Sequence, residues 1–290
     1  MQEINNIYFR KKNTINCRGK VLDLSEPAIM GVLNVTPDSF YDGGAHNSIT
    51  GAMDRISEMI REGADIIDIG AVSTRPGADM LTEDEELKRL LPVLKLVSKE
   101  FPDTIFSSDT FRSNIARIVV SEYGVSIIND ISAGAYDPMM LATVSELNVP
   151  YIIMHIKGTP ENMQTAPEYN DLTGEIFRYF YEKVKFARDM GIKDIILDPG
   201  FGFAKTIDHN YQLLNGLDAY KIFELPVIIG ISRKSMIFKL LENTPSECLN
   251  GSSVLNTISL LKGADIIRVH DVKEAVEAMK IIDKYNSCKI

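Results

Sequence analysis

The sequence predicts a single (β/α)8 barrel, because eight short apolar runs alternate with segments of helical period along 290 residues. That length matches the usual size of a TIM barrel, about 250 residues, and no linker rich in proline, glycine and serine divides it. An open, doubly wound sheet would show the same local pattern. It usually carries a glycine-rich first turn, however, and the first strand here ends in Asn34-Val35-Thr36-Pro37 instead.

Each expected element follows from a local pattern. β-branched, apolar runs bounded by turn residues predict strands over residues 28–33, 66–70, 104–108, 126–129, 151–155, 195–198, 227–231 and 265–269. Helical periodicity, in several cases preceded by an N-capping Thr or Asp, predicts helices over residues 49–62, 83–100, 111–123, 138–147, 172–190, 252–261 and 271–285.

The expected barrel occupies residues 28–290 as one catalytic domain, and residues 1–27 form an N-terminal extension. We expect this extension to be a hairpin that closes the barrel floor. Residues 1–12 lack the apolar core of a signal peptide, and no run approaches the roughly 20 apolar residues that span a bilayer. The sequence therefore predicts a cytoplasmic protein.

Composition restricts the partners of the protein. The hydrophobic content of 45% can fill a sizeable core, and the formal net charge of −9 disfavours binding to nucleic acid or to an anionic membrane. An anionic substrate would need a local cluster of basic side chains. Cys17, Cys248 and Cys288 lie far apart without a Cys-x-x-Cys spacing, which predicts reduced thiols.

The first expected strand runs directly into a polar loop. Asn34, Asp38 and Asp42 supply amide and carboxylate oxygens suited to a cation, while Pro37 and two glycines shape the chain between them. Taken alone, this stretch is explained equally well as an ordinary turn. The other strand ends decide between the two interpretations.

Polar side chains follow each of the seven remaining strands. The active site of a TIM barrel lies at the carboxyl ends of its strands. Alone, each of these groups has an ordinary explanation: an Asp or Asn caps a helix, and His155 is a satisfied core histidine. Together they would be costly to bury without a polar ligand. The groups are Ser73-Thr74-Arg75-Pro76-Gly77, Asp109-Thr110, Asn129-Asp130, Met154-His155, the run from Asp198 to Phe203, Ser232-Arg233-Lys234-Ser235 and Arg268-Val269-His270-Asp271.

The carboxyl ends of the strands together form the mouth of the barrel. A mouth lined by these groups suits a flat heterocycle with an N–C–N edge. Carboxylates accept parallel N–H bonds from a guanidine-like group, and Lys234 would donate to a ring carbonyl. Met154 and Phe203 offer apolar faces for the ring. The acids and amide expected at depth are Asp109, Asn129 and Asp198.

Arg268 and His270 lie two positions apart on an extended strand, so they point the same way and form a basic pair suited to phosphate oxygens. Adding Asn34 as an oxygen ligand suggests Mg²⁺, kept mostly hydrated and shared with a diphosphate. Ser235 stands at the expected start of a helix, where backbone N–H groups face a second anion such as a carboxylate.

At these same segments the chain resembles the dihydropteroate synthase family, from Asn34-Val35-Thr36-Pro37-Asp38-Ser39-Phe40 to Arg268-Val269-His270-Asp271 in order. The resemblance implies a TIM barrel, usually a homodimer, that takes small-molecule substrates. The implied reaction joins 6-hydroxymethyl-7,8-dihydropterin diphosphate to 4-aminobenzoate and releases diphosphate and 7,8-dihydropteroate. Sulfonamides compete with aminobenzoate in this family.

By resemblance, each pocket has a set of residues. The pterin would contact Asp109, Asn129, Met154, Asp198, Phe203, Lys234 and Arg268. The diphosphate would contact Asn34, Arg268 and His270, with Asn34 also on Mg²⁺. The aminobenzoate would contact Thr74, Arg75, Pro76, Phe203, Lys234 and Ser235. The expected catalytic set is Asn34, Asp42, Arg75, Lys234, Arg268 and His270.

Loss of diphosphate from the pterin methylene leaves a cation that the ring delocalises, and Asp42 on the first loop would close over it. Two other functions fit parts of the pattern. A pterin-dependent corrinoid methyltransferase would share the pterin acids but would not need the diphosphate clamp. A catalytically silent barrel acting as a binding partner would be expected to have lost motif residues, and none is lost here.

Overall fold

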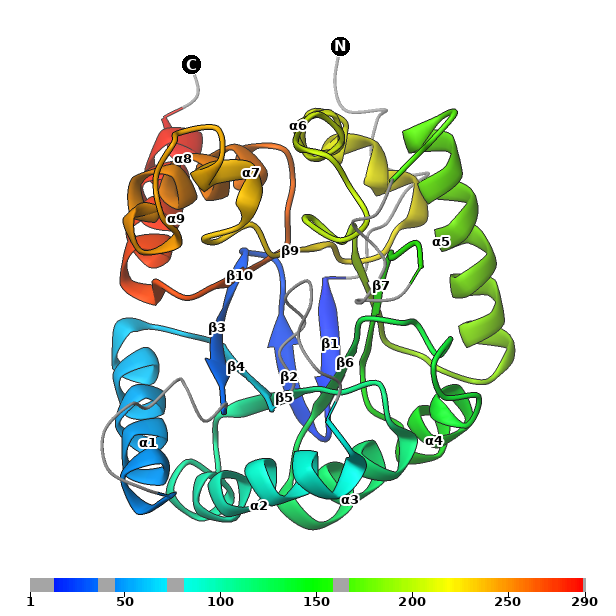
Figure 1. Ribbon diagram of the computed structural model, residues 1–290, viewed down its shortest axis with the longest axis vertical. Helices are drawn as coiled ribbons and strands as arrows, with labels where there is room; N and C mark the ends of the chain where they lie inside the picture. The colour runs from blue at the N-terminus through cyan, green and yellow to red at the C-terminus, as the bar shows by residue number, and fades with distance from the viewer. Residues whose placement is uncertain (1–12, 36–44, 72–80, 159–166, 289–290) are drawn as a thin grey trace.

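The computed structural model describes residues 13–35, 45–71, 81–158 and 167–288. Within them, eight parallel strands form a barrel that is ringed by helices (Figure 1). In sheet order the strands are β8 Ile195–Asp198, β7 Tyr151–Met154, β6 Ile127–Asp130, β5 Ile105–Asp109, β4 Ile66–Gly70, β3 Ala28–Asn34, β10 Ile266–Val269 and β9 Ile228–Ile229. A parallel bridge from Leu197 to Val227 joins the two ends of the sheet. The predicted TIM barrel is confirmed.

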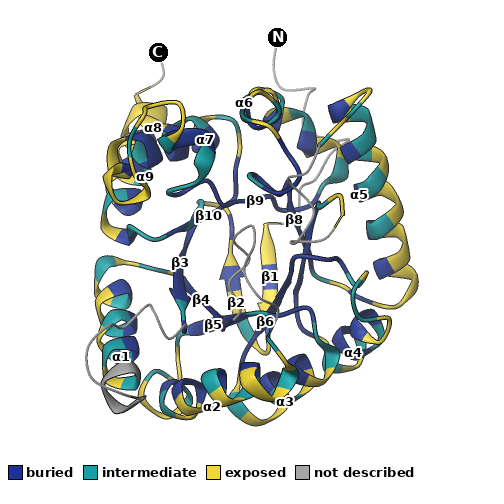
Figure 2. Cartoon of the chain, viewed as in Figure 1, coloured by how far each residue is buried: buried dark blue, intermediate teal, exposed yellow. Residues whose placement is uncertain are grey.

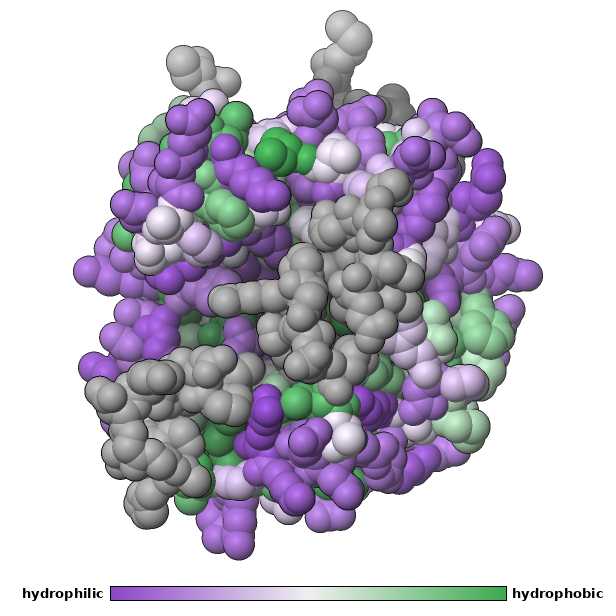
Figure 3. Space-filling view, viewed as in Figure 1, coloured by the Kyte–Doolittle hydropathy of each residue, from purple (hydrophilic) through white to green (hydrophobic). Residues whose placement is uncertain are grey.

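The helices follow the strands in alternation. They are α1 Ala45–Glu62, α2 Glu83–Glu100, α3 Ser113–Tyr123, α4 Met140–Leu147, α5 Leu172–Asp189, α6 Ile207–Asn215, α7 Ser235–Phe238, α8 Leu249–Leu261 and α9 Val272–Ser287, with 3₁₀ turns η2 Leu217–Phe223 and η3 Pro245–Glu247. None of the described helices is long and apolar enough to cross a membrane. The outer helix faces seen in Figure 3 are mainly hydrophilic.

Local sequence signals explain where several helices begin. Thr82 caps α2 in a capping box with Glu85, and Asp171 caps α5 by accepting the Gly174 N–H. The helix expected from residue 111 begins instead at Ser113, because Arg112 is extended and serves as its N-cap residue. Most expected strand boundaries are within one residue, but the strand expected over 227–231 shortens to β9.

Alternation along the strands divides the barrel into an inner and an outer core. The strands of the barrel are largely buried (Figure 2). Outward side chains such as Ile67, Ile69 and Ile153 pack against the helices. Inward side chains at the strand beginnings form an apolar layer of Met30, Ile66, Ile105, Ile127, Ile152, Ile196, Ile228 and Ile266. The next inward positions toward the carboxyl ends are mostly polar. The barrel therefore presents an apolar floor beneath a polar mouth.

The hairpin predicted in the N-terminal extension is confirmed as β1 Thr14–Cys17 and β2 Lys20–Asp23, paired antiparallel. One face buries Ile15, Cys17 and Leu22, and these side chains pack on the inward isoleucine layer at the strand beginnings. The hairpin thus closes the barrel floor.

The described cysteines are free thiols, as expected, and burial raises the pKa of the Cys17 thiol to about 12. The division of the chain at residue 27 stays a prediction.

Truncating the buried face of the hairpin should destabilise the barrel without touching its mouth. We expect Leu22→Ala to lower the free energy of unfolding by about 2–4 kcal/mol, since Leu22 is 6% exposed and its removal leaves a cavity. Val21→Ala is the matched control, because Val21 on the opposite face is 67% exposed. Urea unfolding measures both. Equal losses for the two variants would contradict the closing role of the hairpin.

Candidate functional site

The inward side chains at the carboxyl ends of the strands form a ring of polar groups at the barrel mouth. Strand register places them at similar heights: Asn34 pairs with Gly70, Gly70 with Asp109, and Asp109 with Asn129, while Met154 pairs with Asp198. Sequence-distant residues predicted to act together therefore converge on one end of the barrel.

Arg268 of β10 is central to this ring. Its Nε donates to Asp68 Oδ2 at 2.8 Å, and its second guanidinium nitrogen, Nη2, donates to Asp109 Oδ2 at 3.3 Å. Asn129 Nδ2 donates to the same Asp68 oxygen at 3.0 Å. Four side chains from four strands thus form one connected hydrogen-bond network.

Electrostatics bind this network together. Burial, together with the neighbouring Asp68 carboxylate, raises the pKa of Asp109 well above its ordinary value, and Arg268 opposes the shift. For Arg268 itself, burial favours deprotonation, but the carboxylates of Asp68 and Asp109 outweigh it and raise its pKa. The guanidinium therefore stays charged and compensates the buried Asp68 and the partly buried Asp109.

The opposite side of the mouth holds Asp198 and Lys234. Asp198 Oδ1 accepts the Gly200 N–H at 2.7 Å. Lys234 donates to the Phe201 carbonyl, and its ammonium lies 4.6 Å from the centre of the Phe203 ring. Burial raises the pKa of Asp198 and lowers that of Lys234 to about 8, while each charge partly offsets the shift of the other.

An apolar cluster lies beside these charges. Met154 and Phe203 are buried there together with Phe111, Ile131 and Ala204. Met154 and Phe203 were the two residues expected to face an aromatic ring, and the structure brings them together. Phe111 contacts Tyr136 edge to face, with the ring centroids 5.5 Å apart. The mouth thus offers apolar surface next to carboxylates and cations.

The residues after β9 and β10 form a second cluster. The His270 N–H and ring Nδ1 lie 3.3 and 3.2 Å from Ser232 Oγ. Arg233 adopts a left-handed backbone, φ 58°, and pairs with Asp271 through two hydrogen bonds, of 3.0 Å and 2.5 Å. Ser235 begins a helix as predicted, but α7 is a single turn, so its dipole contributes little.

Several expected residues cannot be placed. Asp42 and the run Thr74, Arg75 and Pro76 lie outside the described residues. His155 is confirmed as a satisfied core histidine: it is 4% exposed, and its Nδ1 lies 3.0 Å from Lys205 Nζ.

A Mg²⁺ ion would find few protein ligands here. Among residues 13–35, 45–71, 81–158 and 167–288, no three His, Cys, Asp or Glu side chains gather as a metal cluster. Asn34, half-buried at the end of β3, offers one amide oxygen. A single neutral ligand suits a Mg²⁺ ion that keeps its waters and binds mainly through substrate phosphates.

Two residues that contact the candidate site, Asp68 and Lys205, were not predicted from the sequence. Asp68 is the only polar residue in the strand Ile66-Ile67-Asp68-Ile69-Gly70, and its alternation with the outward Ile67 and Ile69 was a signal that it points inward. Lys205 follows the Phe203 segment, and nothing in its local sequence indicates that it is buried.

Asp130, adjacent to Asn129, faces the outer core and accepts a hydrogen bond from the Tyr151 hydroxyl at 2.5 Å.

Comparison with known proteins agrees with this geometry. The family model described as "Pterin binding enzyme" matches residues 30–270. The chain is 46% identical over 274 residues to a dihydropteroate synthase of Escherichia coli K12, covering 94% of this chain and 96% of the relative.

Solved structures agree as well. A Yersinia pestis dihydropteroate synthase in a sulfonamide drug complex has a TM-score of 0.89 and 43% identity, covering 95% of this chain and all of that one. A Xanthomonas albilineans dihydropteroate synthase with 4-aminobenzoic acid has a TM-score of 0.89 and 36% identity, covering 96% and 99%. The chain belongs to the dihydropteroate synthase family of pterin-binding enzymes.

Proposed function

We propose that the protein condenses 6-hydroxymethyl-7,8-dihydropterin diphosphate with 4-aminobenzoate to give 7,8-dihydropteroate and diphosphate. The observation that carries this proposal is the ring of inward polar side chains, Asp109, Asn129, Asp198, Lys234 and Arg268, next to the apolar pair Met154 and Phe203. The family relatives favour this synthase over a corrinoid methyltransferase or a silent barrel.

The pterin is proposed to enter the mouth edge first. The carboxylates of Asp109 and Asp198 would accept its N–H groups, and the Lys234 ammonium would donate to its ring carbonyl. These charges already lie beside apolar side chains, so a flat ring can stack on Phe203 and Met154 while its edge reaches the acids. Asn129 is held by Asp68 and presents its remaining amide atoms to the ligand.

The diphosphate is proposed to leave near Asn34 and His270. Arg268 is already engaged by Asp68 and Asp109, so it links the pterin acids to the diphosphate side. Mg²⁺ held by the diphosphate and Asn34 would neutralise charge on the leaving group. Asp42, which lies outside the described residues, belongs to this proposal as a carboxylate that would stabilise the cation.

In the proposed reaction, the bond between the pterin methylene carbon and the diphosphate oxygen breaks, and that oxygen takes the electron pair. The arylamine nitrogen then donates its lone pair to the methylene cation and loses a proton. The protein needs to stabilise separated charge more than to supply a strong base. The aminobenzoate is assigned to Thr74, Arg75, Pro76, Phe203, Lys234 and Ser235, as the family resemblance implies.

The direct test is product formation. Purified protein, Mg²⁺, pterin diphosphate and 4-aminobenzoate should yield dihydropteroate by chromatography, and chelation of Mg²⁺ by EDTA should abolish the product until Mg²⁺ is restored. Absence of product at saturating substrates would refute the synthase assignment. In a separate assay with a methylated folate and a corrinoid, transfer of the methyl group to the corrinoid would instead support the methyltransferase.

Asp68 offers a sharper test of the polar ring. We expect Asp68→Asn to weaken pterin binding by about tenfold, because Arg268 Nε exchanges a carboxylate for a neutral acceptor. Removing the negative neighbour also lowers the pKa of Asp109, so the acid-side midpoint of pterin binding should move to lower pH. Calorimetry with 6-hydroxymethylpterin across pH measures both.

Asp65→Asn is the matched control for Asp68→Asn. Asp65 precedes β4 at the floor end of the barrel and accepts the Ile29 N–H at 2.8 Å. Its substitution should leave pterin affinity and its pH midpoint unchanged. A midpoint that moves to higher pH in Asp68→Asn would contradict the proposed coupling.

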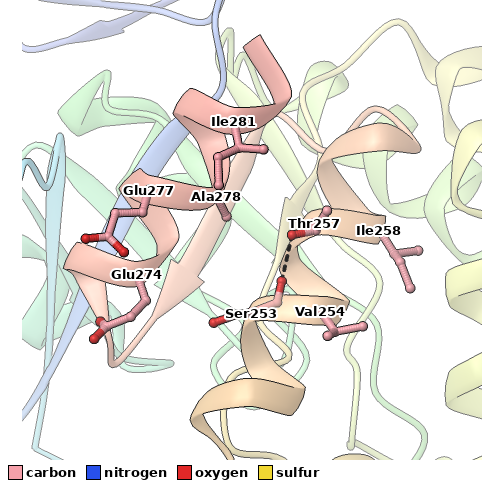
Figure 4. A pocket seen from close by; sticks show the side chains of 8 residues that line it. All are labelled: Ser253, Val254, Thr257, Ile258, Glu274, Glu277, Ala278 and Ile281. Atoms are coloured by element: carbon pink, nitrogen blue, oxygen red, sulfur yellow. Dashed lines mark hydrogen bonds between the residues drawn. The ribbon is translucent and has the colours of Figure 1, made fainter. Parts of the chain in front are cut away.

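We also include a cytoplasmic location and a homodimer in the proposal. The dimer surface is assigned to α8 and α9, which enclose an open groove (Figure 4). Val254, Ile258, Ala278 and Ile281 form its apolar part, and Ser253, Thr257, Glu274 and Glu277 also line it. Leu261 and Tyr285, on the same two helices, are exposed apolar side chains as well. A second copy of the chain would remove these side chains from water.

The dimer proposal predicts the effect of a charge on this face. Wild type should elute at twice its mass of 32.4 kDa, whereas Ile281→Glu should elute as a monomer, because burying a carboxylate opposes association. Ile222→Glu is the control, since Ile222 is comparably exposed, 62% against 69%, but lies on η2. Size-exclusion chromatography with light scattering decides, and a monomeric wild type would refute the dimer.

A further inference from the structure

Lys205 is a buried lysine that none of the assigned pockets uses. Its side chain is almost fully buried, at 3% exposure, yet all three donors of an ammonium are matched. Nζ lies 2.9 Å from the Gly200 carbonyl, 3.0 Å from the Phe203 carbonyl and 3.0 Å from His155 Nδ1. Burying a lysine is unfavourable unless such partners compensate it, so this arrangement indicates a specific role.

The two carbonyls are the ends of the turn over residues 200–203. Between them, the Phe201 carbonyl accepts from Lys234, and the Phe203 ring lies beneath the same ammonium. At its start, the Gly200 N–H donates to Asp198. One lysine therefore holds the two ends of the turn that contacts Lys234 and Asp198, two residues of the proposed pterin site.

The turn is fitted closely to the neighbouring strand. Gly200 has φ 72°, and a Cβ there would come within 2.0 Å of the His155 carbonyl oxygen. The His155 N–H in turn donates to the Asp198 carbonyl at 3.0 Å. His155 thus touches the turn through its backbone and holds Lys205 through its ring, and burial keeps that ring neutral by lowering its pKa to about 2.

The proton on Lys205 is not required for this geometry. Burial lowers the pKa of Lys205 to about 7, opposed by Asp198. As an ammonium it donates to both carbonyls and to His155 Nδ1. As an amine it still donates to both carbonyls, and its lone pair accepts from Nδ1–H of the other histidine tautomer. Both states hold the two ends of the turn.

We propose that Lys205 is a positioning residue for the pterin site. Hydrogen-bonded to the His155 imidazole, it fixes the turn over residues 200–203. The turn thereby orients Asp198, Lys234 and Phe203 toward the ligand. This inference rests on the proposed pterin site. It assigns to the Lys205 and His155 pair a role in pterin affinity in addition to a role in folding.

Lys205→Met removes the three donors while keeping an unbranched side chain. We expect it to raise the dissociation constant of 6-hydroxymethylpterin at least about tenfold, the usual effect of losing hydrogen bonds to a charged group. Lys183→Met is the matched control, because that half-buried lysine donates to the Ala133 carbonyl at 3.0 Å, away from the turn. Calorimetry should show its pterin affinity unchanged.

A pH profile separates positioning from general loss of structure. The charges facing Asp198 are Lys234, Arg268 and Lys205, and all three lower its pKa against the effect of burial. In Lys205→Met the pKa of Asp198 should rise, so the acid-side midpoint of pterin binding should move to higher pH. An unchanged pterin affinity in Lys205→Met would overturn the proposal whether or not the midpoint moves, because the loss of the lysine charge alone can move the midpoint.

Two substitutions of His155 test its contact with Lys205, and they do so even if Lys205→Met does not fold. In His155→Asn, the side-chain Oδ1 can take the place of Nδ1 as an acceptor, so pterin affinity should stay within about threefold, whereas His155→Leu should weaken it at least about tenfold. Equal losses in the two variants would overturn the pairing.

Asp198→Ala separates failure of this inference from failure of the proposed function. If Asp198→Ala leaves pterin affinity unchanged, the pterin site itself is misassigned, and the inference falls with it. If Asp198→Ala weakens binding and Lys205→Met does not, the site stands and the positioning role alone is refuted. Weakening in both variants, with the Lys183 control unaffected, supports both.

Discussion

The barrel mouth depends on the guanidinium of Arg268. Asp68 and Asp109 are carboxylates held close together at low solvent exposure, an arrangement that would otherwise force one of them to take up a proton. Arg268 compensates both and cannot itself deprotonate at ordinary pH. With its charge in place, Asp68 can also fix Asn129, so one cation sets the positions of Asp68, Asp109 and Asn129. A lysine would provide a charge without the fork that reaches two acids.

This arrangement is possible only because the strands alternate strictly. The same register that stacks isoleucines at the floor delivers Asn34, Asp109, Asn129, Asp198 and Arg268 to the inside of the mouth. The hairpin β1–β2 covers the apolar end, so the polar end is left as the place where a ligand can enter. An apolar floor and a charged mouth are two consequences of one periodic pattern.

Sequence alone was sufficient to place Asn34, Asp109, Asn129, Asp198 and Arg268 at one end of the barrel, because both the strand and the polar group at its end can be read locally. It was insufficient where a residue's partners come from elsewhere in the chain. Asp68 lies in the middle of a strand, and only the barrel shows that it meets Arg268, 200 positions away. Asp130 and Asn129 are adjacent in sequence, yet the pleat sends Asp130 outward to Tyr151. Asp42 and Arg75 lie outside the described residues, and their roles stay predictions.

Lys205 and Lys234 contact the same turn from separate places in the fold, and this has a physical consequence. Carbonyl oxygens of a tight turn point in different directions, so successive carbonyls need donors from different sides. Lys205 donates to the Gly200 and Phe203 carbonyls, and Lys234 donates to the Phe201 carbonyl between them. The Lys234 ammonium is therefore held by a neutral oxygen and an aromatic face, and burial keeps its pKa near 8. An ammonium held in this way uses one hydrogen bond to the protein, so its remaining N–H groups can donate to a substrate carbonyl. Weak binding by the protein also suits a group that must release product.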